Sequence, residues 1–182
     1  ASGGALHEPG LWPWADVLAN ALVIEGQLAA ADTFLRSHED RARTRGHRST
    51  MARLGSARGR LSGAMGDLPA ARRAFEESLA LLDGLPFRYD LARVNFAYGQ
   101  TMRRAGRRRE ADSVLRTARE LFTTLGAQAY VARCDRELKA GGLRAGAGDS
   151  ARSTLVVTAL TPQERAGTRL VAAGHTNKKV AE

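Results

Sequence analysis

The sequence has little lysine, cysteine and aromatic content, and it lacks long apolar runs. Lys and Arg together number 28, but the only lysines are Lys139, Lys178 and Lys179, so arginine carries most of the net charge of +9. The single cysteine, Cys134, cannot close an intrachain disulfide or supply a Cys-based zinc site, which excludes a disulfide-stapled secreted scaffold. No apolar run approaches the roughly 18 residues of a membrane span. We therefore expect a cytoplasmic protein without a membrane partner.

Motifs for catalysis and metal binding are also missing. The four histidines are scattered and have no second histidine or carboxylate at helical i, i+4 spacing, which argues against a metal site. There is no G-x-S-x-G nucleophile motif, and no G-x-x-x-x-G-K-[ST] phosphate loop. We expect no enzyme activity and no cofactor in this chain, so any ATPase module would have to precede Ala1.

An internal repeat with a period of about 40 residues is the strongest positive feature. Gly26, Gly66 and Gly106 are evenly spaced, and each lies in a short turn signal. Close packing of two antiparallel helices requires small residues where they face each other, and a large apolar residue fills the space toward the next hairpin. The same columns recur around each glycine: Ala19, Gly59 and Gly99 before it, Ala31, Ala71 and Ala111 five residues after it, and Leu35, Phe75 and Leu115 nine residues after it.

These columns resemble the tetratricopeptide repeat over residues 12–140, although the period is longer than that family's usual one of about 34 residues. The prediction is an all-α fold, a tetratricopeptide-like α-solenoid of antiparallel helix pairs. We expect Cys134, on the last of these helices, to be a small core residue rather than a reactive thiol. The expected helices are Trp12–Ile24, Leu28–Arg45, His47–Ala64, Pro69–Leu82, Phe87–Arg104, Arg108–Leu125 and Ala127–Ala140.

The resemblance also indicates a groove. In the tetratricopeptide pattern, positions six, ten and thirteen before the turn glycine line the concave surface. An arginine-rich groove favours a peptide, a protein or a small anionic effector, while solvent exposure without a ligand is the alternative for each residue taken singly. The candidate residues at these positions are Asp16, Asn20, Arg53, Arg60, Arg93 and Gln100.

The composition changes at Gly141, where a Gly/Ala/Ser-rich stretch predicts a flexible linker over residues 141–153. Beyond it, Thr161 and Glu164 have the spacing of a capping box, with Pro162 at the first helical position. A glycine turn and a second helix start follow before Glu182. From the residues alone, 154–182 begin a helical hairpin.

The amino-acid sequence of this segment resembles the DNA-binding domain of LuxR-type transcription regulators. The matching stretches are Leu160–Arg165, Leu170–Gly174 and Thr176–Glu182, while Gly167 and His175 depart from the pattern. The resemblance implies an incomplete helix-turn-helix domain over 154–182, with its recognition helix beyond this sequence. It also implies phosphate contacts at the start of the second helix, through Thr176, Asn177, Lys178 and Lys179.

Helical repeats ahead of such a domain resemble the large, repeat-containing LuxR-type regulators of bacteria. We therefore expect a C-terminal piece of such a regulator, cut inside the helix-turn-helix, with residues 1–11 as an N-terminal flank. Its repeats would sense a ligand or partner and its head would bind promoter DNA, with homo-oligomer formation as a further option. The alternative is a tetratricopeptide-type interaction scaffold without DNA-binding function.

Overall fold

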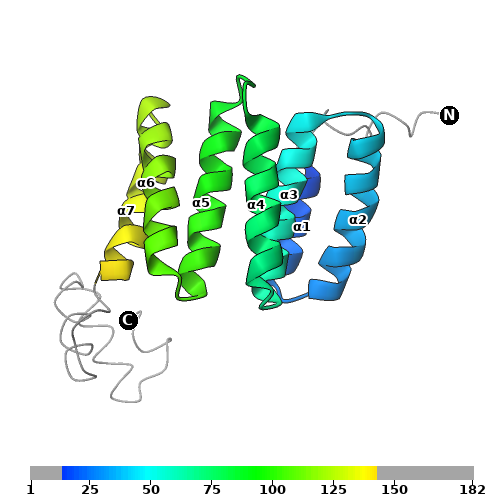
Figure 1. The fold of residues 1–182 in the computed structure, drawn as a ribbon, viewed down its shortest axis with the longest axis horizontal. Helices are drawn as coiled ribbons and strands as arrows, with labels where there is room; N and C mark the ends of the chain where they lie inside the picture. Colours follow the sequence, from blue (N-terminus) through cyan, green and yellow to red (C-terminus); the bar gives the residue numbers. More distant parts are fainter. Residues whose placement is uncertain (1–13, 143–182) are drawn as a thin grey trace, which may run out of the picture. The chain divides into compact units, whose positions relative to one another are not determined.

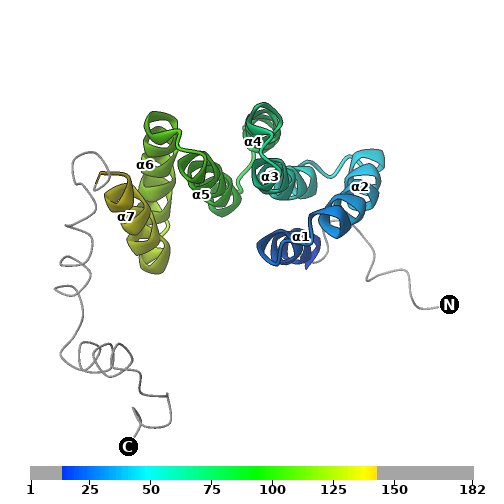
Figure 2. The same cartoon turned by 90° about the horizontal axis from the view of Figure 1, so that it is seen from below.

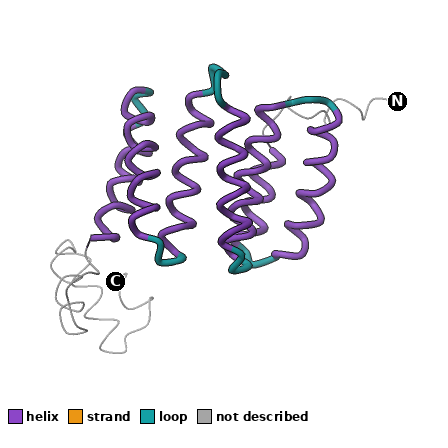
Figure 3. The backbone as a smooth tube through the Cα atoms, viewed as in Figure 1, coloured by secondary structure: helices purple, strands orange, loops and turns teal. Residues whose placement is uncertain are grey.

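The computed structural model describes residues 14–142, and every regular element in that range is an α-helix (Figures 1 and 3). The predicted all-α fold is therefore confirmed for this part of the chain, and the expected ends of the five middle helices agree to within one residue. The helices are α1 (Trp14–Ile24), α2 (Leu28–Thr44), α3 (Arg48–Ala64), α4 (Leu68–Leu82), α5 (Arg88–Arg104), α6 (Arg108–Thr124) and α7 (Gln128–Gly142).

Consecutive helices form antiparallel pairs, as a solenoid requires. Helix α3 packs against α4, and α5 packs against α6, while α3 also contacts α1 and α5. Seen along the helix axes, α1, α3 and α5 succeed one another on one side of the stack (Figure 2). This side carries the positions that the sequence assigned to a groove.

The helices end in glycine turns, and the turn at Gly66 shows how. Gly66 has a φ of 85°, which only glycine adopts without strain. The N–H of Asp67 donates to the carbonyl of Ser62 at 2.9 Å, and that of Gly66 to Gly63 at 3.2 Å, the two bonds of a Schellman motif. The carboxylate of Asp67 then caps the next helix by accepting from the N–H of Ala70. One short segment therefore ends α3 and starts α4.

Small residues set the close approach of the paired helices. A Cβ added at Gly59 would lie 2.7 Å from the ring of Phe75, and one at Gly99 would lie 2.5 Å from Cγ of Leu115. Both distances are shorter than real Cβ contacts, so these glycines are required by packing. The predicted small and large columns are confirmed, since each of their other members is also fully buried: Ala19, Ala31, Ala71, Ala111, Leu35, Phe75 and Leu115.

The core has an aromatic part and an aliphatic part. Around α4–α7, Phe75, Phe96 and Phe122 are buried and the rings of Phe122 and Tyr130 stack at 4.6 Å. The buried residues shared by α1, α2 and α3 are only alanines and leucines. Cys134 is fully buried in the aromatic part, as predicted, and burial raises the pKa of its thiol to about 11.

The C-terminal boundary of the described helices differs slightly from the prediction. Helix α7 continues through Gly141 and Gly142, two residues into the stretch assigned to a linker. The rest of the predicted linker and the whole of 154–182 lie outside the described residues, as do residues 1–13.

Candidate groove between the odd-numbered helices

The six predicted groove residues lie on α1, α3 and α5, and most of them are joined by direct hydrogen bonds or ion pairs. The guanidinium of Arg93 donates to Asp16 Oδ2 at 3.2 Å across α5 and α1. The guanidinium of Arg60 donates to Gln100 Oε1 at 3.3 Å across α3 and α5. Asn20 donates through Nδ2 to the carbonyl of Asp16 at 2.7 Å. The sixth residue, Arg53, contacts Asp90 of α5, which is not one of the six predicted residues.

We call Asp16, Arg53, Asp90 and Arg93 the paired end of the groove. Arg53 donates to Asp90 Oδ2 at 3.2 Å, and the two side chains are only 16% and 11% exposed. Asp16 is 4% exposed and receives Arg93. The space among these side chains is about 40 Å³, hardly more than one water molecule, and Arg53, Asp90 and Arg93 also border a separate hollow of about 520 Å³ beside Phe87 and Tyr89. The ion pairs connect α1, α3 and α5 at this end of the groove.

Burial dominates the chemistry of Asp16. It raises the pKa of that carboxyl above its usual value, and the opposing attraction of Arg93 and Arg53 compensates only in part. An ionised carboxylate at this depth is stable only while both guanidinium groups stay close. The paired end therefore consists of mutually dependent charges, which suits a structural contact better than a catalytic one.

We call Asn20, Arg60 and Arg104 the open end of the groove. It adjoins a cavity of about 620 Å³. No carboxylate in residues 14–142 forms an ion pair with Arg60 or Arg104, whereas Arg53 and Arg93 each have one. The cavity is lined by Asn20, Val23, Ile24, Arg60, Gly63, Ala64, Gly66, Leu68, Thr101, Arg104 and Ala105.

Positive charge accumulates around Arg60 without a matching anion. Burial lowers the pKa of Arg60 to about 10, and repulsion from Arg104, Arg93 and Arg133 adds to the effect. The carboxylate of Glu137 opposes this lowering of the pKa of Arg60. It accepts a hydrogen bond from Gln100 at 2.7 Å and forms an ion pair with Arg103. Arg60 therefore keeps its proton at neutral pH but lies in a site that favours an added negative charge.

Sequence reasoning found most of the paired end but missed Asp90 and the apolar cavity wall, and for Arg104 it favoured a solvated side chain over contact with a phosphate or an acidic partner. Asp90 lies one helical turn before Arg93 on the same face of α5, so extending the tetratricopeptide positions by one turn would have found it. Arg104 ends α5 within a run of arginines, where sequence alone favours a solvated side chain near the helix terminus. Nothing in the sequence distinguishes the wall residues Val23 and Ile24 from ordinary core residues of α1.

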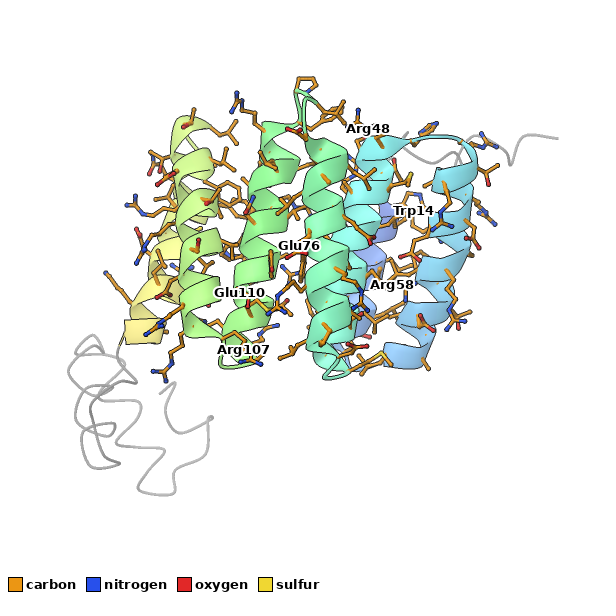
Figure 4. The ribbon with its side chains drawn as sticks, in the orientation of Figure 1. Trp14, Arg48, Arg58, Glu76, Arg107 and Glu110 are labelled. Carbon is orange, nitrogen blue, oxygen red and sulfur yellow. The ribbon has the colours of Figure 1, made fainter. Side chains whose placement is uncertain are left out.

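Other charged clusters connect neighbouring helices away from the groove. Arg58 on α3 pairs with Asp32 and Glu39 of α2, between the two helices (Figure 4). Arg72 on α4 pairs with Glu110 of α6 at 2.8 Å, and this hydrogen bond lowers the pKa of Glu110. Each cluster consists of complementary charges in direct contact, so none provides an unpaired nucleophile or base.

Two further properties concern the described part only. Within residues 14–142, no three His, Cys, Asp or Glu side chains converge as a metal site would require. In the same range, no helix is both long and apolar enough to cross a bilayer. The predicted phosphate-contacting residues Thr176, Asn177, Lys178 and Lys179 lie outside the described residues.

No protein-family model matches the chain, and no curated protein matches it significantly. The groove is therefore interpreted from its own chemistry.

Proposed function

We propose that the chain belongs to a DNA-binding transcription regulator, in which the helical repeats sense a ligand and a LuxR-type helix-turn-helix contacts DNA. The observation that carries the proposal is the residue pattern of 160–182, with its capping box, glycine turn and second capped helix start. The repeats add a surface suited to a sensor, because the groove ends in a cavity large enough for a small molecule.

DNA contact in this proposal is electrostatic. Thr176 and Asn177 would place backbone N–H groups of a helix N-terminus near a phosphate, and Lys178 and Lys179 would add two ammonium groups. Base recognition belongs to the third helix of such a domain and is assigned to no residue of this chain. We therefore expect the 182-residue chain to bind duplex DNA weakly, without sequence preference and with a steep dependence on salt.

The test is a fluorescence anisotropy titration of the full chain with labelled random-sequence duplexes at several salt concentrations. The variant Lys178→Ala/Lys179→Ala should weaken binding uniformly and reduce the slope of log K against log salt by about 2, since each phosphate contact contributes about 1. The matched control is Arg136→Ala/Lys139→Ala, which also removes two positive charges, both from exposed positions of α7.

The outcomes separate two sources of DNA binding. If the double variant retains the slope of the unsubstituted chain, the arginine-rich repeats hold the DNA and the proposed head does not. Selective binding of one duplex sequence by this chain would also contradict the account, because it would require a base-reading element within these residues.

An interaction scaffold is the second candidate, and one patch favours it. Phe87, Tyr89 and Leu125 are 42%, 44% and 41% exposed and border a hollow of about 520 Å³ beside the loop between α4 and α5. Neighbouring exposed apolar side chains of this kind are typical of protein contact sites. A scaffold would lose its partner on Phe87→Ser/Tyr89→Ser and would show no effect of the Lys178→Ala/Lys179→Ala change.

A further inference from the structure

We propose that the cavity at the open end of the groove binds a small amphipathic organic anion, whose carboxylate or phosphate is held by Arg60 and Arg104. The inference rests on the sensor role proposed for the repeats and specifies the chemical class of the ligand. Its basis is that the guanidinium groups beside this cavity have no carboxylate partner in the described residues, whereas those at the paired end are neutralised by Asp16 and Asp90.

The charge at the open end is not neutralised within the described residues. Arg60 is half-buried, and its only hydrogen bond to a side chain there goes to the neutral amide of Gln100 at 3.3 Å. Arg104 forms no ion pair within residues 14–142 and lines the same cavity. A half-buried guanidinium without a carboxylate is unfavourable, and an incoming anion removes that cost while gaining two charge-assisted contacts.

The dipoles of the helices that end at the cavity do not reverse its preference for an anion. Helices α1, α3 and α5 all end beside the cavity, and three carboxyl termini would together contribute about −1.5 charges if unscreened. Two guanidinium groups outweigh this contribution. Some of the terminal carbonyls are also occupied, because those of Leu22, Ser62 and Met102 accept backbone N–H groups in the glycine turns at 2.9 Å.

The remaining walls are largely apolar. Val23, Ile24 and Leu68 line the cavity, and Ile24 is 78% exposed, which is unusual for a large aliphatic side chain beside a core. Covering these groups with an alkyl chain would stabilise the complex through the hydrophobic effect. A volume of about 620 Å³ falls within the range of small-molecule sites. The ligand therefore needs an apolar part as well as a charge.

Asn20 adds a finer preference. Its Nδ2 donates to the carbonyl of Asp16, which fixes the orientation of the amide. Its Oδ1 is buried and accepts no hydrogen bond from the described residues. Solvent does not reach this oxygen, so a ligand hydroxyl group near the anionic end supplies the missing donor once the Asn20 side chain turns toward the cavity that it lines. We therefore expect 3-hydroxydecanoate to bind more tightly than decanoate, by up to about tenfold.

The experiment is isothermal titration calorimetry on the full chain, with decanoate and decyl phosphate as anionic probes below their micelle concentrations. Decanol tests the apolar part alone, inorganic phosphate the charge alone, and decylammonium the opposite charge. Both anionic probes should bind with one site per chain, and the other three should bind at least about tenfold more weakly. Preference for decanoate or for decyl phosphate identifies a carboxylate or a phosphate ligand.

Three variants test the named residues. Arg60→Gln and Arg104→Gln should each weaken decanoate binding about tenfold, because each removes one charged donor. Ala64→Phe should abolish binding by filling the cavity from an exposed position of α3, which leaves the core intact. The matched control is Arg108→Gln at the exposed start of α6, which lowers the net charge equally without touching the cavity. Circular dichroism checks that each variant is folded.

Several results would overturn the inference. These are equal binding of decanol and decanoate, retention of binding in Ala64→Phe, and an equal loss in Arg108→Gln and Arg60→Gln. The DNA titration on the same protein distinguishes the two proposals. Lost anion binding with salt-dependent DNA binding intact rejects the cavity alone. Anion binding without any DNA association rejects the regulator and leaves a ligand-binding repeat.

Discussion

The two ends of the groove use the same side-chain type for different purposes. At the paired end, Arg53 and Arg93 each meet an aspartate of another helix, and the space among the paired side chains is about 40 Å³. At the open end, Arg60 and Arg104 meet no carboxylate in the described residues and border about 620 Å³. Whether a groove arginine stabilises the fold or is available to a ligand therefore depends on the side chain opposite it.

The largest expected effect is at the paired end. Asp90→Ala removes the only carboxylate that accepts a hydrogen bond from the buried Arg53 in the described residues and leaves it the attraction of Asp16 alone, so it should lower the free energy of unfolding by about 3 kcal/mol. Urea denaturation followed by circular dichroism measures it. The control is Asp40→Ala on α2, whose partner Arg43 is exposed, so the loss there should stay below about 0.5 kcal/mol. Equal losses in both variants would contradict a special role for the paired end.

The open end should respond with the opposite sign. Arg60→Met removes a half-buried charge that has no ion-pair partner in the described residues, and we expect the free energy of unfolding to rise by about 1 kcal/mol. The same denaturation measurement applies. A fall of similar size would show that Arg60 stabilises the fold, as Arg53 does, and would remove the distinction between the two ends.

Acid titration sharpens the comparison further. The pKa of Asp16 is raised in the folded state, so between its ordinary value of 3.8 and the raised value the native protein binds more protons than the unfolded chain. This carboxyl therefore adds stability as the pH falls through that window, and Asp16→Asn should remove the gain. Glu110 has the opposite effect on stability, because the hydrogen bond from Arg72 lowers its pKa. Its contribution to the free energy of unfolding is present above pH 4.5 and is lost as the pH falls below that value.

The smallest expected effect is that of Arg104→Gln on stability. The side chain is exposed and forms no ion pair in the described residues, so the change should stay within about 0.5 kcal/mol. Thermal unfolding in the absence of ligand measures it. A loss of more than about 1 kcal/mol in the free energy of unfolding would mean that Arg104 stabilises the end of α5 and is not free to bind a ligand.

The fold could be predicted from the sequence because its determinants are local. A glycine that ends a helix, a small residue where two helices touch and a large one beside it recur once in every repeat, and the contacts at Gly59 and Gly99 explain why. Gly46, Gly84 and Gly126 also have positive φ and end the second helix of each pair, but their spacings of 38 and 42 residues depart from the 40-residue period of the first set.

The groove could be predicted only in outline. The resemblance to the tetratricopeptide repeat placed Asp16, Arg53 and Arg93 on one side of the solenoid, and the structure joins α1, α3 and α5 through these residues. Their pairing depends on the offset between adjacent helices, which joins Arg53 to Asp90, 37 residues away. The cavity depends on the spacing of three helix ends, and no local pattern in the sequence encodes that distance. The difference between the paired and open ends therefore became visible only in three dimensions.

The central claim is that the open end lacks an anion, and thermal unfolding with and without decanoate tests it most directly. A ligand that binds only the folded state stabilises it by RT ln(1 + [L]/Kd), so the melting temperature keeps rising with the logarithm of ligand concentration once that concentration exceeds Kd. We expect such a rise with decanoate for the unsubstituted chain and almost none for Arg60→Met, although that variant starts from the higher melting temperature. Equal rises in both proteins, or a rise with decylammonium as large as with decanoate, would contradict it.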